Sequence, residues 1–154
     1  MTHYHVFNGD ADGLCAMVQL YRAAPNPNAV IVTGRKRDIK LLERVDAKAG
    51  DHVTVLDVSM HSNKTALVGL LDAGAQVFYA DHHNAGDIPG HKNLTAHIDT
   101  SPEICTAAIV DDVLGGAYRA WAVCAAFGDN FPRLAQRMGE GHNLPLERLQ
   151  HLGI

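Results

Sequence analysis

The chain has 154 residues, of which 47% are hydrophobic and 19% are charged, and this is the size and composition of one globular domain rather than of a disordered segment. With 17 acidic and 13 basic residues the net charge is −4, so the protein as a whole does not attract nucleic acid or anionic membranes, and any phosphate binding must be local. No apolar run approaches the roughly 20 residues of a membrane span, and the N-terminus lacks the layout of a signal peptide. We therefore expect a cytoplasmic protein with no membrane partner.

Three scattered cysteines without a C-x-x-C pair indicate neither disulfides nor a thiolate zinc site.

Short runs rich in β-branched and aromatic residues predict five strands. They cover residues 4–7, 29–33, 52–58, 75–81 and 94–99. Between them, apolar residues at three- and four-residue spacing predict helices over 12–24, 38–47 and 62–74. Alternating strands and helices are typical of crossover units. The expected fold is therefore α/β, with a five-stranded, mostly parallel sheet and helices on both faces.

The rest of the chain has a helical pattern, with helices predicted over 103–115, 117–128, 131–141 and 145–154. The first of these could bind an anion with its first-turn amides, or Ser101 is simply its N-cap. We expect a main domain over 1–131 and a helical C-terminal segment over 132–154. That segment stops without a capping residue, as the start of a linker to a second domain would.

Polar and acidic side chains follow three of the predicted strands at the point where each strand ends. They are Asn8, Asp10 and Asp12 after the first strand, Asp57 at the end of the third, and Asp81, His82 and His83 after the fourth. In an open parallel sheet the ligand crevice lies beyond the carboxyl ends of the strands. These side chains are therefore expected to meet at one edge of the sheet.

Asp57 stands between the apolar stretches VTVL and VSM. A lone buried carboxylate costs several kcal/mol or takes up a proton, and a bound metal ion removes that cost. The alternatives are that Asp57 caps the following helix or pairs with a lysine.

The Asp81-His82-His83 triplet narrows the choice of metal, because imidazole beside carboxylate suits borderline divalent ions such as Mn²⁺, Zn²⁺ or Fe²⁺. In an extended segment His82 and His83 point to opposite sides, so we expect one of them to be a ligand and the other a neighbour. Four carboxylates carry too much charge for one small ion but suit two ions that share a bridge. Paired ions activate water for displacement at phosphorus, so the residues indicate hydrolysis of a phosphate ester or a phosphoanhydride.

The only local basic patch follows the second predicted strand and consists of Arg35, Lys36 and Arg37. These side chains could hold a substrate phosphate at the same edge of the sheet. The alternative is a solvated basic loop.

Four motifs resemble, in order and spacing, those of the DHH phosphoesterase superfamily: DADG at 10–13, the strand-end Asp57, DHH at 81–83 and GD at 128–129. This superfamily includes single-strand exonucleases, nano-RNases, cyclic-dinucleotide phosphodiesterases, exopolyphosphatases and family II pyrophosphatases. The resemblance runs from residue 4 to about residue 131. It implies a phosphoesterase that uses two Mn²⁺ ions, with Mg²⁺ or Co²⁺ as possible substitutes.

The resemblance also implies a role for each motif residue. The implied metal ligands are Asp57 between the two ions, Asp10 on the first ion, and Asp12, His82 and Asp129 on the second. His83 would face the substrate phosphate as a donor or general acid, and Asp81 would orient the histidines. Asp57, Asp81 and His83 are thus the candidate catalytic residues.

Two features depart from the family pattern. The family's histidine four residues before Asp10 is replaced by Val6, and Asn8 offers a weaker amide oxygen instead. The family's smaller C-terminal substrate-binding domain has no counterpart after Asn130. These departures leave open the alternative that the chain is a domain that binds a phosphorylated ligand without cleaving it.

The motif sequence DADG is most similar to that of the exonucleases in the superfamily. This similarity favours a Mn²⁺-dependent hydrolase of phosphodiesters in single-stranded nucleic acid or short nucleotides. Phosphoanhydride hydrolysis, of pyrophosphate or polyphosphate, is the enzymatic alternative.

Overall fold

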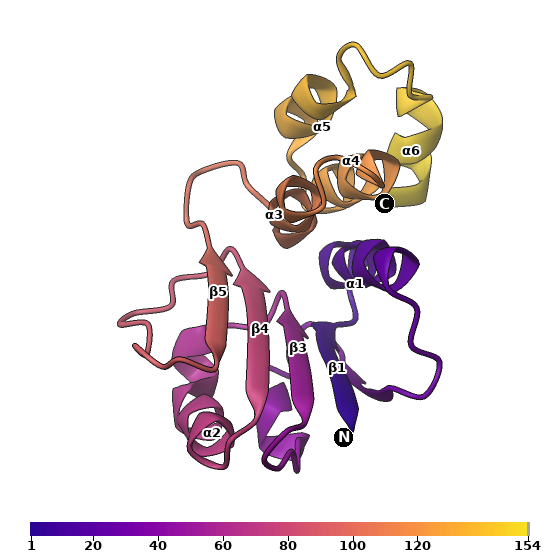
Figure 1. Ribbon diagram of the computed structural model, residues 1–154. Helices are drawn as coiled ribbons and strands as arrows, with labels where there is room; N and C mark the ends of the chain where they lie inside the picture. The colour runs from indigo at the N-terminus through magenta and orange to yellow at the C-terminus, as the bar shows by residue number, and fades with distance from the viewer. Residues whose placement is uncertain (154) are drawn as a thin grey trace.

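The computed structural model describes residues 1–153 and places a five-stranded sheet between two layers of helices (Figure 1). The strands are β1 (His3–Asn8), β2 (Val30–Gly34), β3 (His52–Leu56), β4 (Gln76–Asp81) and β5 (Leu94–Ile98). Their order in the sheet is β2-β1-β3-β4-β5, and every neighbouring pair is parallel. The predicted α/β fold is confirmed.

The helices are α1 (Ala11–Ala23), α2 (Met60–Asp72), α3 (Thr106–Val113), α4 (Arg119–Gly128), α5 (Pro132–Gly139) and α6 (Leu146–Gly153). The helix predicted over 38–47 is wrong, because only a short 3-10 helix, η1 (Leu41–Arg44), forms there. The side chain of Asn63 in α2 accepts from the Leu42 N–H and donates to the Ile39 carbonyl. Backbone groups that a longer helix would pair internally are thus bonded to α2.

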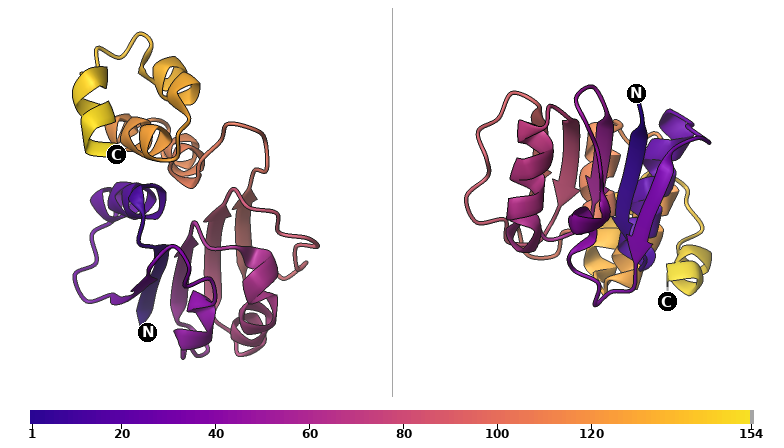
Figure 2. Two further views of the ribbon diagram at one scale, coloured as in Figure 1. Left: turned by 180° about the vertical axis from the view of Figure 1, so that it is seen from behind. Right: turned by 90° about the horizontal axis from the view of Figure 1, so that it is seen from below.

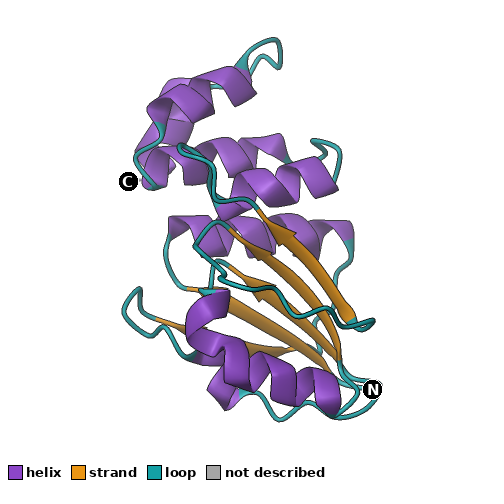
Figure 3. Ribbon diagram, turned by 90° about the vertical axis from the view of Figure 1, so that its left-hand side faces the viewer, coloured by secondary structure: helices purple, strands orange, loops and turns teal. Residues whose placement is uncertain are grey.

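Alternation along the strands divides the buried side chains between the two faces of the sheet. Val6, Val55 and Tyr79 belong to the core that packs against α2 and η1. Phe7 and Leu56 belong to the core that packs against α1, α3 and α4. Figure 3 shows α2 on one side of the sheet and α1 with the later helices on the other.

The C-terminal helices α5 and α6 pack against α4 and lie at the end of the molecule away from α2 (Figure 2). Gly128 and Gly153 let α4 and α6 approach closely, because a side chain at either position would collide with a backbone carbonyl of the other helix. Within residues 1–153, no helix is both long enough and apolar enough to cross a membrane.

The sheet order positions the candidate site. Because β1, β3 and β4 are adjacent and parallel, the residues that follow Asn8, Leu56 and Asp81 emerge side by side at one edge. The chain winds outward to β2 in one direction and to β3, β4 and β5 in the other, so the strand order reverses between β1 and β3. Such a switch point is where open α/β sheets bind ligands.

Candidate metal centre

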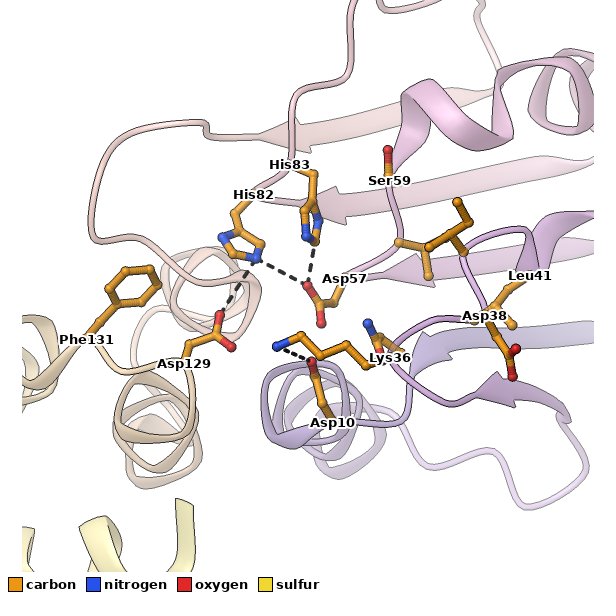
Figure 4. Close-up of a pocket in the computed structure, with 13 residues that line it drawn as sticks. Asp10, Lys36, Asp38, Leu41, Asp57, Ser59, His82, His83, Asp129 and Phe131 are labelled. Atoms are coloured by element: carbon orange, nitrogen blue, oxygen red, sulfur yellow. Dashed lines mark ion pairs between the residues drawn. The ribbon is translucent and has the colours of Figure 1, made fainter. Parts of the chain in front are cut away.

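A pocket of about 360 Å³ lies at the carboxyl ends of β1, β3 and β4 (Figure 4). The residues predicted from the sequence that line it are Asn8, Asp10, Lys36, Asp57, His82, His83 and Asp129. They come from separate segments of the chain, so the fold brings together groups that the sequence scatters.

His82 is the point on which the acidic side chains converge. Its Nδ1 donates to the Ile104 carbonyl at 2.9 Å, which directs Nε2 into the pocket. The Nε2 atom lies 3.4 Å from a carboxylate oxygen of Asp57 and 3.7 Å from oxygens of both Asp12 and Asp129. A backbone partner on one ring nitrogen with the other nitrogen free is the usual arrangement of a metal-binding histidine.

Asp12 lies in the first turn of α1 and is completely buried. Its two carboxylate oxygens accept from the backbone N–H groups of Thr106 and Ala107, at 2.8 and 2.7 Å. The first-turn amides of α3 therefore bind an anion, and that anion is the protein's own side chain. Each oxygen of Asp12 keeps a second lone pair for a cation.

The alternative that Ser101 caps this helix is wrong, because α3 begins at Thr106 with Cys105 in the N-cap position. Ser101 instead bonds to the carboxylate of Asp99. A capping side chain is not needed at α3, since Asp12 supplies the oxygens that a cap would supply.

Asp57 has a left-handed backbone, with φ of 58°, directly after β3. Two hydrogen bonds connect this segment to β4. The Asp57 N–H donates to the Ala80 carbonyl at 3.1 Å, and the Tyr79 hydroxyl donates to the Val58 carbonyl at 2.6 Å. The alternative that Asp57 caps α2 is wrong, because Ser59 is the N-cap. Backbone strain of this kind costs about 1–3 kcal/mol and collects at functional sites.

His83 lies next to His82, with ring centroids 4.4 Å apart. The expectation that the two rings point to opposite sides is wrong, because β4 ends at Asp81 and the alternation of a strand no longer applies. His83 Nδ1 bonds to the buried carboxylate of Asp81 at 2.7 Å and lies 3.9 Å from Asp57. The side chain of His83 is 46% exposed, so it can meet a ligand in the pocket.

Asp10 is the N-cap of α1, and its side chain accepts from the Gly13 N–H at 3.2 Å. The other carboxylate oxygen lies 3.7 Å from the Lys36 ammonium. Of the predicted basic patch, Lys36 lines the pocket, whereas Arg35 and Arg37 are exposed and do not.

Burial and mutual repulsion perturb the acidic groups. Burial, together with the charges of Asp57 and Asp129, raises the pKa of Asp12 well above its usual range. Burial and the neighbouring Asp10 raise the pKa of Asp57 to about 6, and burial raises the pKa of Asp129. Burial lowers the pKa of His82, but the surrounding carboxylates outweigh it and raise that pKa to about 9. Carboxylates crowded in this way take up protons unless a cation balances them.

The donor set fits divalent cations. Two groups of residues each offer three possible ligand atoms that lie within 4.8 Å of one another. One group is Asp57, His82 and His83, and the other is Asp12, His82 and Asp129, so His82 belongs to both. Asn8 lines the same pocket, and its side-chain oxygen is buried without a hydrogen-bond partner; one oxygen of Asp81 is also unpaired. Oxygen and imidazole donors together suit Mn²⁺ and similar ions.

Val6 and His5 supply no ligand here. Val6 is completely buried in the core on the α2 side. His5 points to the other face of the sheet and lines a separate cavity with Met17 and Phe78.

The sequence reasoning missed several contributors to the site, which include the Ile104 carbonyl and the pocket-lining residues Asp38, Ile39, Leu41, Val58, Ser59 and Phe131. The backbone carbonyl of Ile104, which orients His82, carries no side-chain signal that a sequence could show. Phe131 lines the pocket two residues after Asp129, and that nearness to a motif residue could have identified it.

No protein-family model and no curated protein matches this sequence. The solved structures that resemble the chain include two structures of RecJ. One is RecJ from Thermus thermophilus in complex with Mn²⁺, at 21% identity and a TM-score of 0.55 over 90% of this chain and 24% of that one. The other is exonuclease RecJ bound to manganese, at 21% identity and a TM-score of 0.56 over 99% of this chain and 42% of that one. The chain thus spans less than half the length of either protein and shares the fold of their matched parts.

Proposed function

We propose that the chain is a metal-dependent phosphodiesterase of the DHH type that acts on single-stranded nucleic acid or short nucleotides. The observation that carries this proposal is the convergence of Asp12, Asp57 and Asp129 on the free imidazole nitrogen of His82. These residues are separated widely in the chain; Asp57, His82 and Asp129 line the pocket, and Asp12 is completely buried.

The residues that would hold the cations are Asn8, Asp10, Asp12, Asp57, His82 and Asp129, and Asp57 would serve as a ligand of both ions. A pair of bound Mn²⁺ ions would lower the pKa of a water molecule and neutralise the oxygens of a phosphate in an in-line displacement. The hydrogen bonds to Asp12 and His82 hold these ligands in position before any cation arrives.

His83 is the proposed general acid or donor toward the substrate phosphate. Its hydrogen bond to Asp81 raises the pKa of His83. Asp81 acts through that bond as a positioning residue. Lys36, at the pocket wall, is proposed to bind the phosphate, with Arg35 and Arg37 nearby on the same loop.

The structural neighbours support this assignment. Both are described as bound to manganese, and one is described as an exonuclease. Likeness of fold alone does not give an activity, so the assignment depends on the pocket chemistry described above.

A second candidate is a non-catalytic domain that binds phosphorylated ligands. It is favoured by Val6, which leaves the first cation without an imidazole, and by the Lys36 ammonium near Asp10, which competes with a cation for that carboxylate.

Cleavage assays distinguish the candidates. The protein, supplied with Mn²⁺, is incubated separately with a labelled single-stranded oligonucleotide, a cyclic dinucleotide and pyrophosphate. We expect cleavage of a phosphodiester and its loss on chelation of the metal. Cleavage of pyrophosphate alone would support phosphoanhydride hydrolysis, and binding without cleavage would support the non-catalytic candidate.

A further inference from the structure

Phe131 lines the pocket, and none of the roles proposed above uses it. Figure 4 shows its ring beside Asp129 and His82, while the Lys36 ammonium lies next to Asp10 and Asp38 lies farther from the ring. The ring is partly buried against the core between the sheet and helices α1, α3 and α4. Its remaining surface faces the pocket, so an apolar aromatic surface borders a strongly acidic site.

The position of Phe131 is determined by a tight turn between α4 and α5. Asn130 has a left-handed backbone, with φ of 60°, and the Phe131 N–H donates to the Ala126 carbonyl at 2.7 Å. The Phe131 carbonyl accepts from the Ala135 N–H in the first turn of α5. The backbone that presents the ring is thus held at both ends, two residues from a candidate metal ligand.

An exposed aromatic surface gains nothing from an inorganic phosphate, which is charged and strongly hydrated. A nucleobase has an apolar π-face that stacks on aromatic side chains, and such stacking tolerates any base. The pocket therefore combines a cation site for a phosphate with an aromatic surface for the group attached to it.

We propose that Phe131 is a stacking surface for the nucleobase next to the scissile phosphate, which makes nucleotides rather than pyrophosphate the substrates of this pocket. This inference rests on the proposed phosphodiesterase function. Because stacking is independent of base identity, the contact gives affinity for nucleotides without a sequence preference.

The test compares an ordinary single-stranded oligonucleotide with the same strand carrying abasic residues. KM and kcat are measured by cleavage in Mn²⁺, and Kd is measured by fluorescence anisotropy with phosphorothioate-linked strands, which are hydrolysed slowly. The variants are Phe131→Leu, which keeps apolar packing without the ring, and Phe131→Tyr, which keeps the ring. Phe127→Leu is the matched control, because Phe127 packs against the same core and does not line the pocket.

For the ordinary strand we expect Phe131→Leu to raise Kd and KM about tenfold with kcat little changed. The abasic strand should show no change, and Phe131→Tyr and Phe127→Leu should behave as the wild type. Equal losses on both strands, or an equal loss from Phe127→Leu, would show that Phe131 acts only in packing and would overturn the inference.

The outcome separates the two proposals. If the wild type binds the ordinary strand more tightly than the abasic strand through Phe131 but cleaves neither, stacking stands and the phosphodiesterase proposal fails. If the wild type cleaves both strands equally and Phe131→Leu changes nothing, the phosphodiesterase proposal stands and stacking fails.

Discussion

The two walls of the pocket are built differently. On the wall formed by α1, α3, α4 and the ends of β3 and β4, the candidate ligands are held by other parts of the chain: Asp12 by two backbone amides and His82 by a carbonyl. On the wall formed by the loop after β2, the side chain of Lys36 is 79% exposed and makes one long ion pair with Asp10. The geometry needed for cations is thus preorganised, whereas the charge offered to a phosphate is exposed and held by a single ion pair.

Asp57→Asn gives the largest expected effect on the preorganised wall. Asparagine tolerates the left-handed backbone at this position, so the fold is kept while the charge is removed. We expect Mn²⁺-dependent cleavage to fall at least about a hundredfold, because even residues that only orient metal ligands cost about 10- to 100-fold when changed. Asp72→Asn, an exposed residue of α2 outside the pocket, should retain full activity. Retained activity in Asp57→Asn would remove Asp57 from the site.

Asp81→Asn tests the next contact on the same wall. The amide keeps the shape of the carboxylate but loses the charge that raises the pKa of His83, so that pKa should fall toward its ordinary value. We expect a loss of about 10- to 100-fold in kcat. Histidine NMR titration measures the pKa directly. An unchanged His83 titration would contradict the proposed positioning role.

Metal-free protein should become less stable as the pH rises. The His82 pKa of about 9 exceeds its unfolded value of 6.5, so the stability that His82 contributes is present below pH 6.5 and is lost as the pH rises through 9. The Asp57 pKa of about 6 exceeds its unfolded value of 3.8, so ionisation of Asp57 removes stability in the same direction.

Thermal unfolding between about pH 5 and 9 measures this dependence, and we expect Tm to fall by a few degrees. Added Mn²⁺ should reverse the fall, and His82→Gln should flatten its upper part. A Tm that rises over this range without metal would contradict the account.

The wall formed by the loop after β2 should give the smallest effects. Lys36→Ala should raise KM a few-fold, since an exposed cation contributes about 0–1 kcal/mol. It should also reduce by about one the slope of the logarithm of the oligonucleotide binding constant against the logarithm of the salt concentration. Arg35→Ala should have a smaller effect, because Arg35 does not line the pocket. Titration of binding against salt concentration measures both. A loss as large as that of Asp57→Asn would show that the loop is as well organised as the opposite wall.

Sequence reasoning was most successful where local pattern decides structure. The parallel sheet follows from alternating strands and helices, and the strand ends alone indicate that Asp10, Asp57 and His82 meet at one edge. It failed where the local structure depends on residues distant in the chain. The N-terminus of α3 depends on Asp12, 94 residues away, and the 38–47 segment is held by Asn63. The paired orientation of His82 and His83 depends on where β4 ends, which periodicity alone does not locate.

Isothermal titration of the purified metal-free protein with Mn²⁺ tests the central claim most directly. The account predicts two ions bound per chain, proton release on binding because His82 must lose its proton, and weaker binding by Asp57→Asn than by Asp72→Asn. A wild-type protein that binds no Mn²⁺, or that binds it no better than Asp57→Asn, would contradict the account.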